Sequence, residues 1–175
     1  MNPLRSSEPN KGSVQIGNAG NLREINRDIA SAVIFSSDGY VLMGRKDPKE
    51  GGVYPNSWHI PGGGKEEGES LEQTVIREVG QETGLPLSAD QLTPVPIVGE
   101  GSAVKTLSTG EQVWCKMKFN RFEVRLNKTA DELKGVVKPG DDLVELRWFA
   151  PNELAHVEQI PGGREFFIQA GYITE

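Results

Sequence analysis

The chain has 175 residues, of which 36% are hydrophobic and 25% are charged, and its formal net charge is −6. This composition is typical of a globular domain and excludes a chain that is disordered throughout. The acidic balance argues against broad binding to nucleic acids or anionic membranes, which select basic surfaces, so an anionic substrate would need local cations or a metal.

Residues 1–25 are rich in Asn, Ser, Gly and Pro and show no periodicity. They predict a flexible arm, with a short edge strand at 14–16, ahead of a single domain over 26–175. No signal peptide is visible, and no segment approaches the roughly 20 apolar residues that span a bilayer, so we expect a cytoplasmic protein. Cys115 is the only cysteine, and its alternating neighbours favour apolar packing over nucleophilic chemistry.

Two apolar runs, 29–35 and 40–44, flank Ser36-Ser37-Asp38-Gly39, and an Asp-Gly pair in this position predicts a β-hairpin. A long loop over 46–56 follows, and then a short strand around 58–60 leads into Pro61-Gly62-Gly63-Gly64. The later part of the chain predicts three more strands, at 93–100, 112–124 and 144–149, and a hairpin loop at 101–110 joins the first two. It also predicts two short helices, at 151–156 and 163–170. Strands on both sides of a central helix predict an α/β fold with a mixed sheet between helical layers.

The central helix is expected over 70–83. Ser70 is a favourable N-cap, and Gln73, three residues later, completes a capping box. Gly84 fits the position just beyond the helix, and Pro86 prevents its continuation.

Two glutamates of this helix lie beside its apolar face. At about 100° per residue, Leu71, Val75 and Val79 form one stripe, and Glu78 and Glu82 fall on or next to it. Like charges one turn apart repel each other, and an unpaired carboxylate at a buried face is costly. A divalent cation such as Mg²⁺ would remove both penalties and could be shared with substrate phosphates. The glycines before the helix would let the backbone approach that ion closely.

These residues resemble the Nudix box, G-x5-E-x7-R-E-U-x-E-E-x-G-U, in which U is a bulky apolar residue. The match runs from Gly63 through Glu69 to Arg77-Glu78-Val79-Gly80-Gln81-Glu82-Thr83-Gly84-Leu85, and Gln81 replaces the first glutamate of the adjacent pair. The resemblance implies an α/β/α sandwich and hydrolysis of a diphosphate linkage in a nucleoside diphosphate derivative or nucleoside triphosphate. It also makes a homodimer plausible.

Residue by residue, the resemblance implies that Glu78 and Glu82 bind metal and take part in catalysis, with a carbonyl of Gly62 or Gly63 completing the shell. Gln81 offers only a neutral oxygen, so we expect one well-held Mg²⁺, or Mn²⁺ in its place. Arg77 and Glu69 are implied to form a structural ion pair.

The resemblance also implies a further carboxylate from a loop before a late strand. Asp142 is the first choice, ahead of the three alternatives Asp141, Glu145 and Glu100. A helix glutamate or Asp142 would then accept the proton of the attacking water.

Five residues before the box are candidates for substrate binding, each with a structural alternative. His59 could face the substrate or pack within its strand, and Tyr54 and Trp58 could stack on a base or belong to the core. Arg45 and Lys46 could contact phosphate or be solvated at a strand end.

Three functions remain open from the sequence. The first is metal-dependent hydrolysis of a nucleotide diphosphate linkage. The second is isomerase-like action on a non-nucleotide diphosphate. The third is a nucleotide-sensing module with weakened catalysis, which the replacement at Gln81 motivates. Retention of both Glu78 and Glu82 favours the enzyme.

Overall fold

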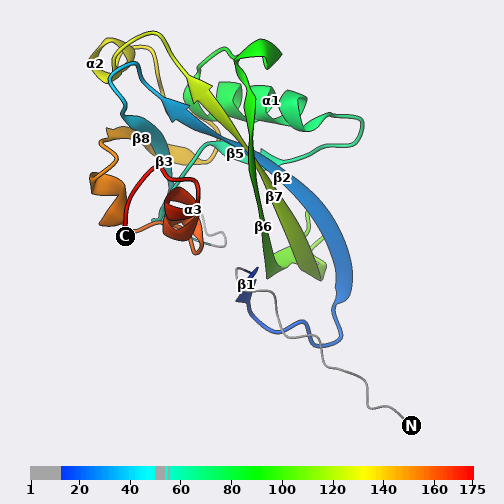
Figure 1. The fold of residues 1–175 in the computed structure, drawn as a ribbon. Helices are drawn as coiled ribbons and strands as arrows, with labels where there is room; N and C mark the ends of the chain where they lie inside the picture. The colour runs from blue at the N-terminus through cyan, green and yellow to red at the C-terminus, as the bar shows by residue number, and fades with distance from the viewer. Residues whose placement is uncertain (1–12, 50–53, 55) are drawn as a thin grey trace.

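A long strand through the middle of the sheet organises the fold. In the computed structural model, which describes residues 13–49, 54 and 56–175, β2 (Arg23–Phe35) alternates in exposure at first and is then buried at every position from Ala30 to Phe35. Continuous burial follows because helices cover both faces of this half of the strand, as Figure 1 shows. The predicted strand over 29–35 is confirmed, and it begins six residues earlier than expected.

The sheet is mixed, as predicted. β2 pairs in parallel with β7 along its whole length and antiparallel with β3 and β5, and β1 pairs in parallel with β6. The order is β1-β6-β7-β2-β3-β4, with β5 joined to β2 and β8 joined to β3. The bounds of these strands are β1 (Ser13–Ile16), β3 (Val41–Lys46), β4 (Trp58–His59), β5 (Gly62–Gly64), β6 (Thr93–Thr106), β7 (Gln112–Arg125) and β8 (Leu143–Phe149).

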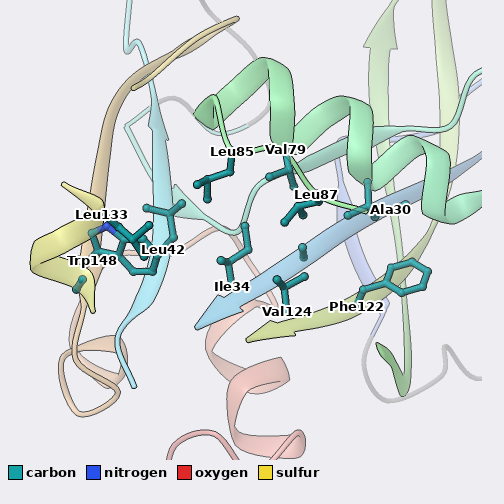
Figure 2. Packing of buried hydrophobic residues seen from close by; sticks show 13 residues of the cluster. Ala30, Ile34, Leu42, Val79, Leu85, Leu87, Phe122, Val124, Leu133 and Trp148 are labelled. Atoms are coloured by element: carbon teal, nitrogen blue, oxygen red, sulfur yellow. The ribbon is translucent and has the colours of Figure 1, made fainter. Parts of the chain in front are cut away.

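Each face of the sheet carries its own apolar core. Ala30, Ala32 and Ile34 of β2 pack with Val75 and Val79 of α1 (Leu71–Thr83) on one face, the cluster drawn in Figure 2. The alternate β2 residues pack on the other face with aromatic residues of α3 (Gly163–Gln169). The two faces follow from the two-residue repeat of a strand, and they give the α/β/α arrangement.

Helix α1 begins and ends as the sequence predicts. The Ser70 side chain accepts a hydrogen bond from the Gln73 N–H, and the Gln73 Oε1 accepts one from the Ser70 backbone N–H. Gly84 ends the helix with a φ of 75°, a left-handed conformation that glycine adopts without strain. Three shorter helical turns complete the described chain: α2 (Ala130–Leu133), η1 (Ala89–Gln91) and η2 (Glu153–Ala155).

Several boundaries differ from the expectation. Residues 101–106, predicted as loop, extend β6, because their backbone pairs with β1 on one side and β7 on the other. Residues 62–64, expected as a glycine loop, form β5 against β2. The helix expected over 151–156 is the single turn η2. α2 and η1, four and three residues long, were not predicted.

The N-terminal segment contributes to the sheet. Of the expected arm, residues 1–12 lie outside the described residues, whereas 13–25 contain β1 and the beginning of β2. Figure 1 shows this end of the sheet, with β6, β7 and β2, extending away from α1 and α3. Within the described residues, no helix is long and apolar enough to cross a membrane. Cys115 on β7 is buried, in agreement with the predicted packing role.

Candidate active site

Glu82 is a carboxylate held inside the protein by the last turn of α1. Its exposed fraction is 3%, because it lies on the same side of the helix as Val75 and Val79. The backbone N–H of Gly62 donates a hydrogen bond of 2.9 Å to Glu82 Oε2. Burial raises the pKa of Glu82 to about 8, the Gly62 N–H opposes this, and the nearby charge of Glu78 adds to it. The prediction that this glutamate faces the interior is confirmed.

Glu78 lies one turn earlier on α1 and is also largely withdrawn from solvent, with a side-chain exposure of 12%. Its Oε1 accepts a hydrogen bond of 2.7 Å from Arg77 Nη1. A β-carbon at Gly63 would overlap the Glu78 carboxylate. Glycine at 63 therefore lets β5 run directly beside this carboxylate.

Asp141 supplies the third carboxylate of this group. One oxygen from each of Glu78, Glu82 and Asp141 lies within 4.8 Å of the others. The loop that carries Asp141 is fixed to the C-terminal end of α1, because the N–H of Gly140 donates to the Glu82 carbonyl at 3.0 Å and the N–H of Lys138 donates to Thr83 at 2.9 Å.

Asp142, the first choice from the sequence, pairs with Lys46, and its charge also helps to raise the pKa of Glu82. Its Oδ2 lies 2.7 Å from Lys46 Nζ, at the end of β3, and its Oδ1 is buried with no hydrogen-bond partner among the described residues. Glu145 pairs with Arg45, and Glu100 lies exposed on β6. The sequence could not separate adjacent aspartates in an irregular turn, because no periodicity fixes the direction of either side chain there.

Arg77 joins the loop before α1 to the helix, as predicted. Its guanidinium binds both oxygens of Glu69, at 2.6 and 3.0 Å, and also donates to the Gly64 carbonyl at 3.1 Å. Hydrogen bonds from Arg77 lower the pKa of Glu69 to about 2. This bidentate arrangement fixes β5 and the Glu69 loop relative to Glu78.

The donor set fits a hard divalent cation. Three carboxylates converge, and each is an oxygen ligand of the kind that Mg²⁺ and Mn²⁺ accept. Without a cation, burial is the main cause of the raised pKa of Glu82, and the charge of Glu78 adds to it. Gln81 is exposed and its Oε1 lies 3.4 Å from Arg77 Nη1.

His59 is the last residue of β4 and is 8% exposed. Its Nδ1 lies 3.0 Å from the Ile60 carbonyl, whereas Nε2 is buried with no partner among the described residues. Burial lowers the pKa of His59, so the ring is neutral near neutral pH.

The other expected substrate residues have structural contacts. Trp58 packs edge-on against Phe149, with ring centroids 4.9 Å apart. Arg45 binds Glu145 at 2.8 Å and Asn56 at 2.7 Å, and Lys46 is paired with Asp142. Tyr54 is half-buried, and its neighbours 50–53 and 55 lie outside the described residues.

A cavity of about 590 Å³ lies on the face of the sheet that α3 covers and was not foreseen from the sequence. His59 and Ile60 line one side of it, immediately before the Pro61-Gly62 segment that binds Glu82. The remaining walls come from β6, β7 and the segment that leads into α3. These residues are far apart in the sequence, so only the folded sheet and α3 bring them together.

Comparisons with known proteins agree with this fold. The NUDIX domain family matches residues 25–169. The nucleoside triphosphatase NudI of Escherichia coli K12 is 29% identical over 133 residues, which cover 75% of this chain and 87% of that protein.

Two solved structures illustrate the likeness in fold. The MutT protein of Methanosarcina mazei Go1 superposes with a TM-score of 0.59 at 23% identity, covering 86% of this chain and 96% of that one. The NUDIX domain of Shewanella oneidensis NrtR, solved with ADP ribose, superposes with a TM-score of 0.61 at 17% identity, covering 84% and 87%.

The fold and the box define a hydrolase that acts on phosphoric anhydride bonds. The chain belongs to the Nudix family, because the family match covers most of its length.

Proposed function

We propose that this protein hydrolyses a diphosphate linkage in a nucleoside triphosphate or nucleoside diphosphate derivative, with one bound divalent metal. The observation that carries the proposal is the convergence of Glu78, Glu82 and Asp141 within 4.8 Å. The likeness to the nucleoside triphosphatase NudI supports a nucleotide substrate.

The three carboxylates would hold Mg²⁺, or Mn²⁺ in its place. The ion, when bound, would neutralise phosphate charge and lower the pKa of water. We assign no ligand role to Gln81, because its side chain is exposed and turned toward Arg77. One ion held by protein side chains is therefore the expected number.

The protein's own groups would position the reaction. The Gly62 N–H fixes Glu82 Oε2 and leaves Oε1 without a described hydrogen bond. We assign proton acceptance to Glu82 Oε1, because this buried carboxylate oxygen has no described hydrogen bond and can accept a proton. In the step, the water oxygen bonds to phosphorus, its proton passes to Glu82, and the bridging P–O bond breaks. Asp142 is a weaker candidate base, because it is already paired with Lys46.

The test is a panel of nucleoside triphosphates and nucleoside diphosphate derivatives, assayed with Mg²⁺ or Mn²⁺ on the wild type, Glu82→Gln and Glu67→Gln. Glu67 is an exposed glutamate of the loop before α1 and provides the matched control. We expect kcat/KM to fall about 100-fold or more in Glu82→Gln and to be unchanged in Glu67→Gln. Reaction in ¹⁸O water identifies the attacked phosphorus.

Two outcomes would contradict the proposal. If no diphosphate compound is turned over while one binds tightly, the protein is a nucleotide-binding module. If Glu82→Gln retains wild-type activity, this carboxylate has no part in the reaction.

A further inference from the structure

The cavity of about 590 Å³ contains one cation that the active-site chemistry does not use. Its walls are largely apolar and aromatic, with Ile97 from β6, Phe119 from β7 and Phe166 from α3. Arg121, on the same face of β7 as Phe119, extends into this space. A charged side chain in such surroundings needs a compensating partner or a function.

Arg121 is held by aromatic rings rather than by a carboxylate. Its guanidinium carbon lies 4.2 Å from the Phe166 ring centroid and 5.5 Å from that of Phe119. No described residue accepts a hydrogen bond from it or forms an ion pair with it within 4 Å. Burial alone lowers the pKa of Arg121 to about 10. Glu100 and Glu165 also line the cavity, but neither contacts the guanidinium.

Arg125, four residues further along β7, is an arginine that has a carboxylate partner as well as an aromatic one. It stacks on Phe35 at 4.5 Å in the same manner, but it also pairs with Glu123 at 2.6 Å. Glu123 lies between the two arginines and its other oxygen accepts a hydrogen bond from the Tyr172 hydroxyl. The nearest carboxylate along the strand is thus already engaged, and Arg121 is left with free donors.

The facing strand leaves room for the guanidinium. A β-carbon at Gly99 would lie 3.0 Å from Arg121 Nη1, so a larger residue there would press on the side chain. With Phe166 on one side and Gly99 near Nη1, the planar guanidinium is fixed in orientation before any ligand arrives. A fixed fork of donors recognises two acceptors at low entropic cost.

We propose that Arg121 determines the base specificity of the enzyme, by donating hydrogen bonds to a planar base whose edge carries carbonyl oxygens instead of amino groups. This inference rests on the proposed function. His59 and Ile60 line the cavity, and two residues later the N–H of Gly62 binds Glu82. In this proposal the phosphates lie at the carboxylates and the base occupies the cavity. Aromatic walls would stack on the base. Arginine has only donors, so it accepts a carbonyl edge and repels an amino group at the same position.

The test compares binding and hydrolysis of nucleotides in two matched sets, GTP against ATP and UTP against CTP. Dissociation constants are measured by calorimetry in the Glu82→Gln background, and kcat/KM is measured with Glu82 intact. We expect a preference for the carbonyl-bearing base of about tenfold or more, lost in Arg121→Met. Arg125→Met, the matched control, should keep the preference. The affinity for tripolyphosphate should be the same in Arg121→Met as in the protein that retains Arg121.

Melting temperatures separate this role from a structural one. An unpaired buried cation costs stability, so Arg121→Met without ligand should melt at the wild-type temperature or above it. If Arg121→Met has a lower Tm and an unchanged base preference, the inference is overturned. It is also overturned if Arg121→Met weakens the binding of tripolyphosphate as much as the binding of GTP. Because calorimetry in the Glu82→Gln background needs no turnover, failure of the hydrolytic function and failure of the Arg121 assignment give different results.

Discussion

Lys46 Nζ lies 2.7 Å from Asp142 Oδ2, and this pair turns Asp142 toward the end of β3. The preceding residue, Asp141, has a φ of 54° and directs its carboxylate to Glu78 and Glu82. Two adjacent aspartates therefore have different surroundings. Asp141 has an oxygen within 4.8 Å of oxygens of Glu78 and Glu82, whereas Asp142 pairs with a lysine and helps to raise the pKa of Glu82.

Asp141→Asn and Asp142→Asn should consequently differ in metal binding. Removing the Asp141 charge takes away one of three converging ligands and should weaken Mg²⁺ binding about tenfold or more. Asp142→Asn should change Mg²⁺ affinity by about threefold at most, because it alters a half-exposed ion pair. Calorimetric titration with Mg²⁺ measures both. The larger loss in Asp142→Asn would show that our assignment of the third carboxylate is wrong.

The stabilising effect of Mg²⁺ should depend on pH through Glu82. Its folded pKa of about 8 lies above the ordinary value of 4.5, so the folded protein retains a proton that the unfolded chain releases. Without metal, this group's contribution to stability is present at low pH and is lost as pH rises from about 4.5 to about 8.

Mg²⁺ binds the ionised carboxylate and must displace this proton. The increase in Tm on adding Mg²⁺ should therefore be larger at about pH 8.5 than at about pH 6, as thermal melts in matched buffers would detect. Glu82→Gln should abolish this difference. An equal Mg²⁺ effect at both pH values in the wild type would contradict the assignment.

Two glycines near Glu78 should respond oppositely to alanine. Gly63→Ala places a β-carbon on the Glu78 carboxylate, so Mg²⁺ affinity and activity should both fall. Gly80→Ala meets no atom within 4 Å on the exposed side of α1 and should raise the free energy of unfolding by about 0.5–1 kcal/mol. Urea unfolding and Mg²⁺ titration test both. Normal metal binding in Gly63→Ala would remove the reason given for glycine at 63.

Arg77→Lys should weaken metal binding although Arg77 is not a metal ligand. Lysine cannot hold both oxygens of Glu69 and also reach the Gly64 carbonyl, so β5 and Glu78 lose their common anchor. We expect a loss in Mg²⁺ affinity of about 10-fold to 100-fold. Arg147→Lys, which alters an exposed pair with Glu153, is the control and should bind Mg²⁺ normally. Unchanged affinity in Arg77→Lys would contradict the anchoring role.

Local patterns determined much of this protein from the sequence. The capping box at Ser70, the left-handed Gly84 and the inward-facing Glu78 and Glu82 follow from neighbours within a few residues. The hairpin between β2 and β3 follows in the same way from Asp38-Gly39. Helix periodicity and turn chemistry are short-range, and they can be read without knowing the rest of the fold.

Tertiary structure alone decided what long-range packing controls. Extension of β6 through 101–106 depends on β1 and β7, which are separate in the sequence. The choice of Asp141 over Asp142 depends on the docking of Gly140 against α1, and the cavity around Arg121 depends on α3 covering β7. A side chain's direction in a loop, or its lack of a partner, is set by segments that arrive from elsewhere in the chain. Local sequence patterns do not encode these long-range contacts. The sequence therefore predicted the type of chemistry but not every residue of the candidate site.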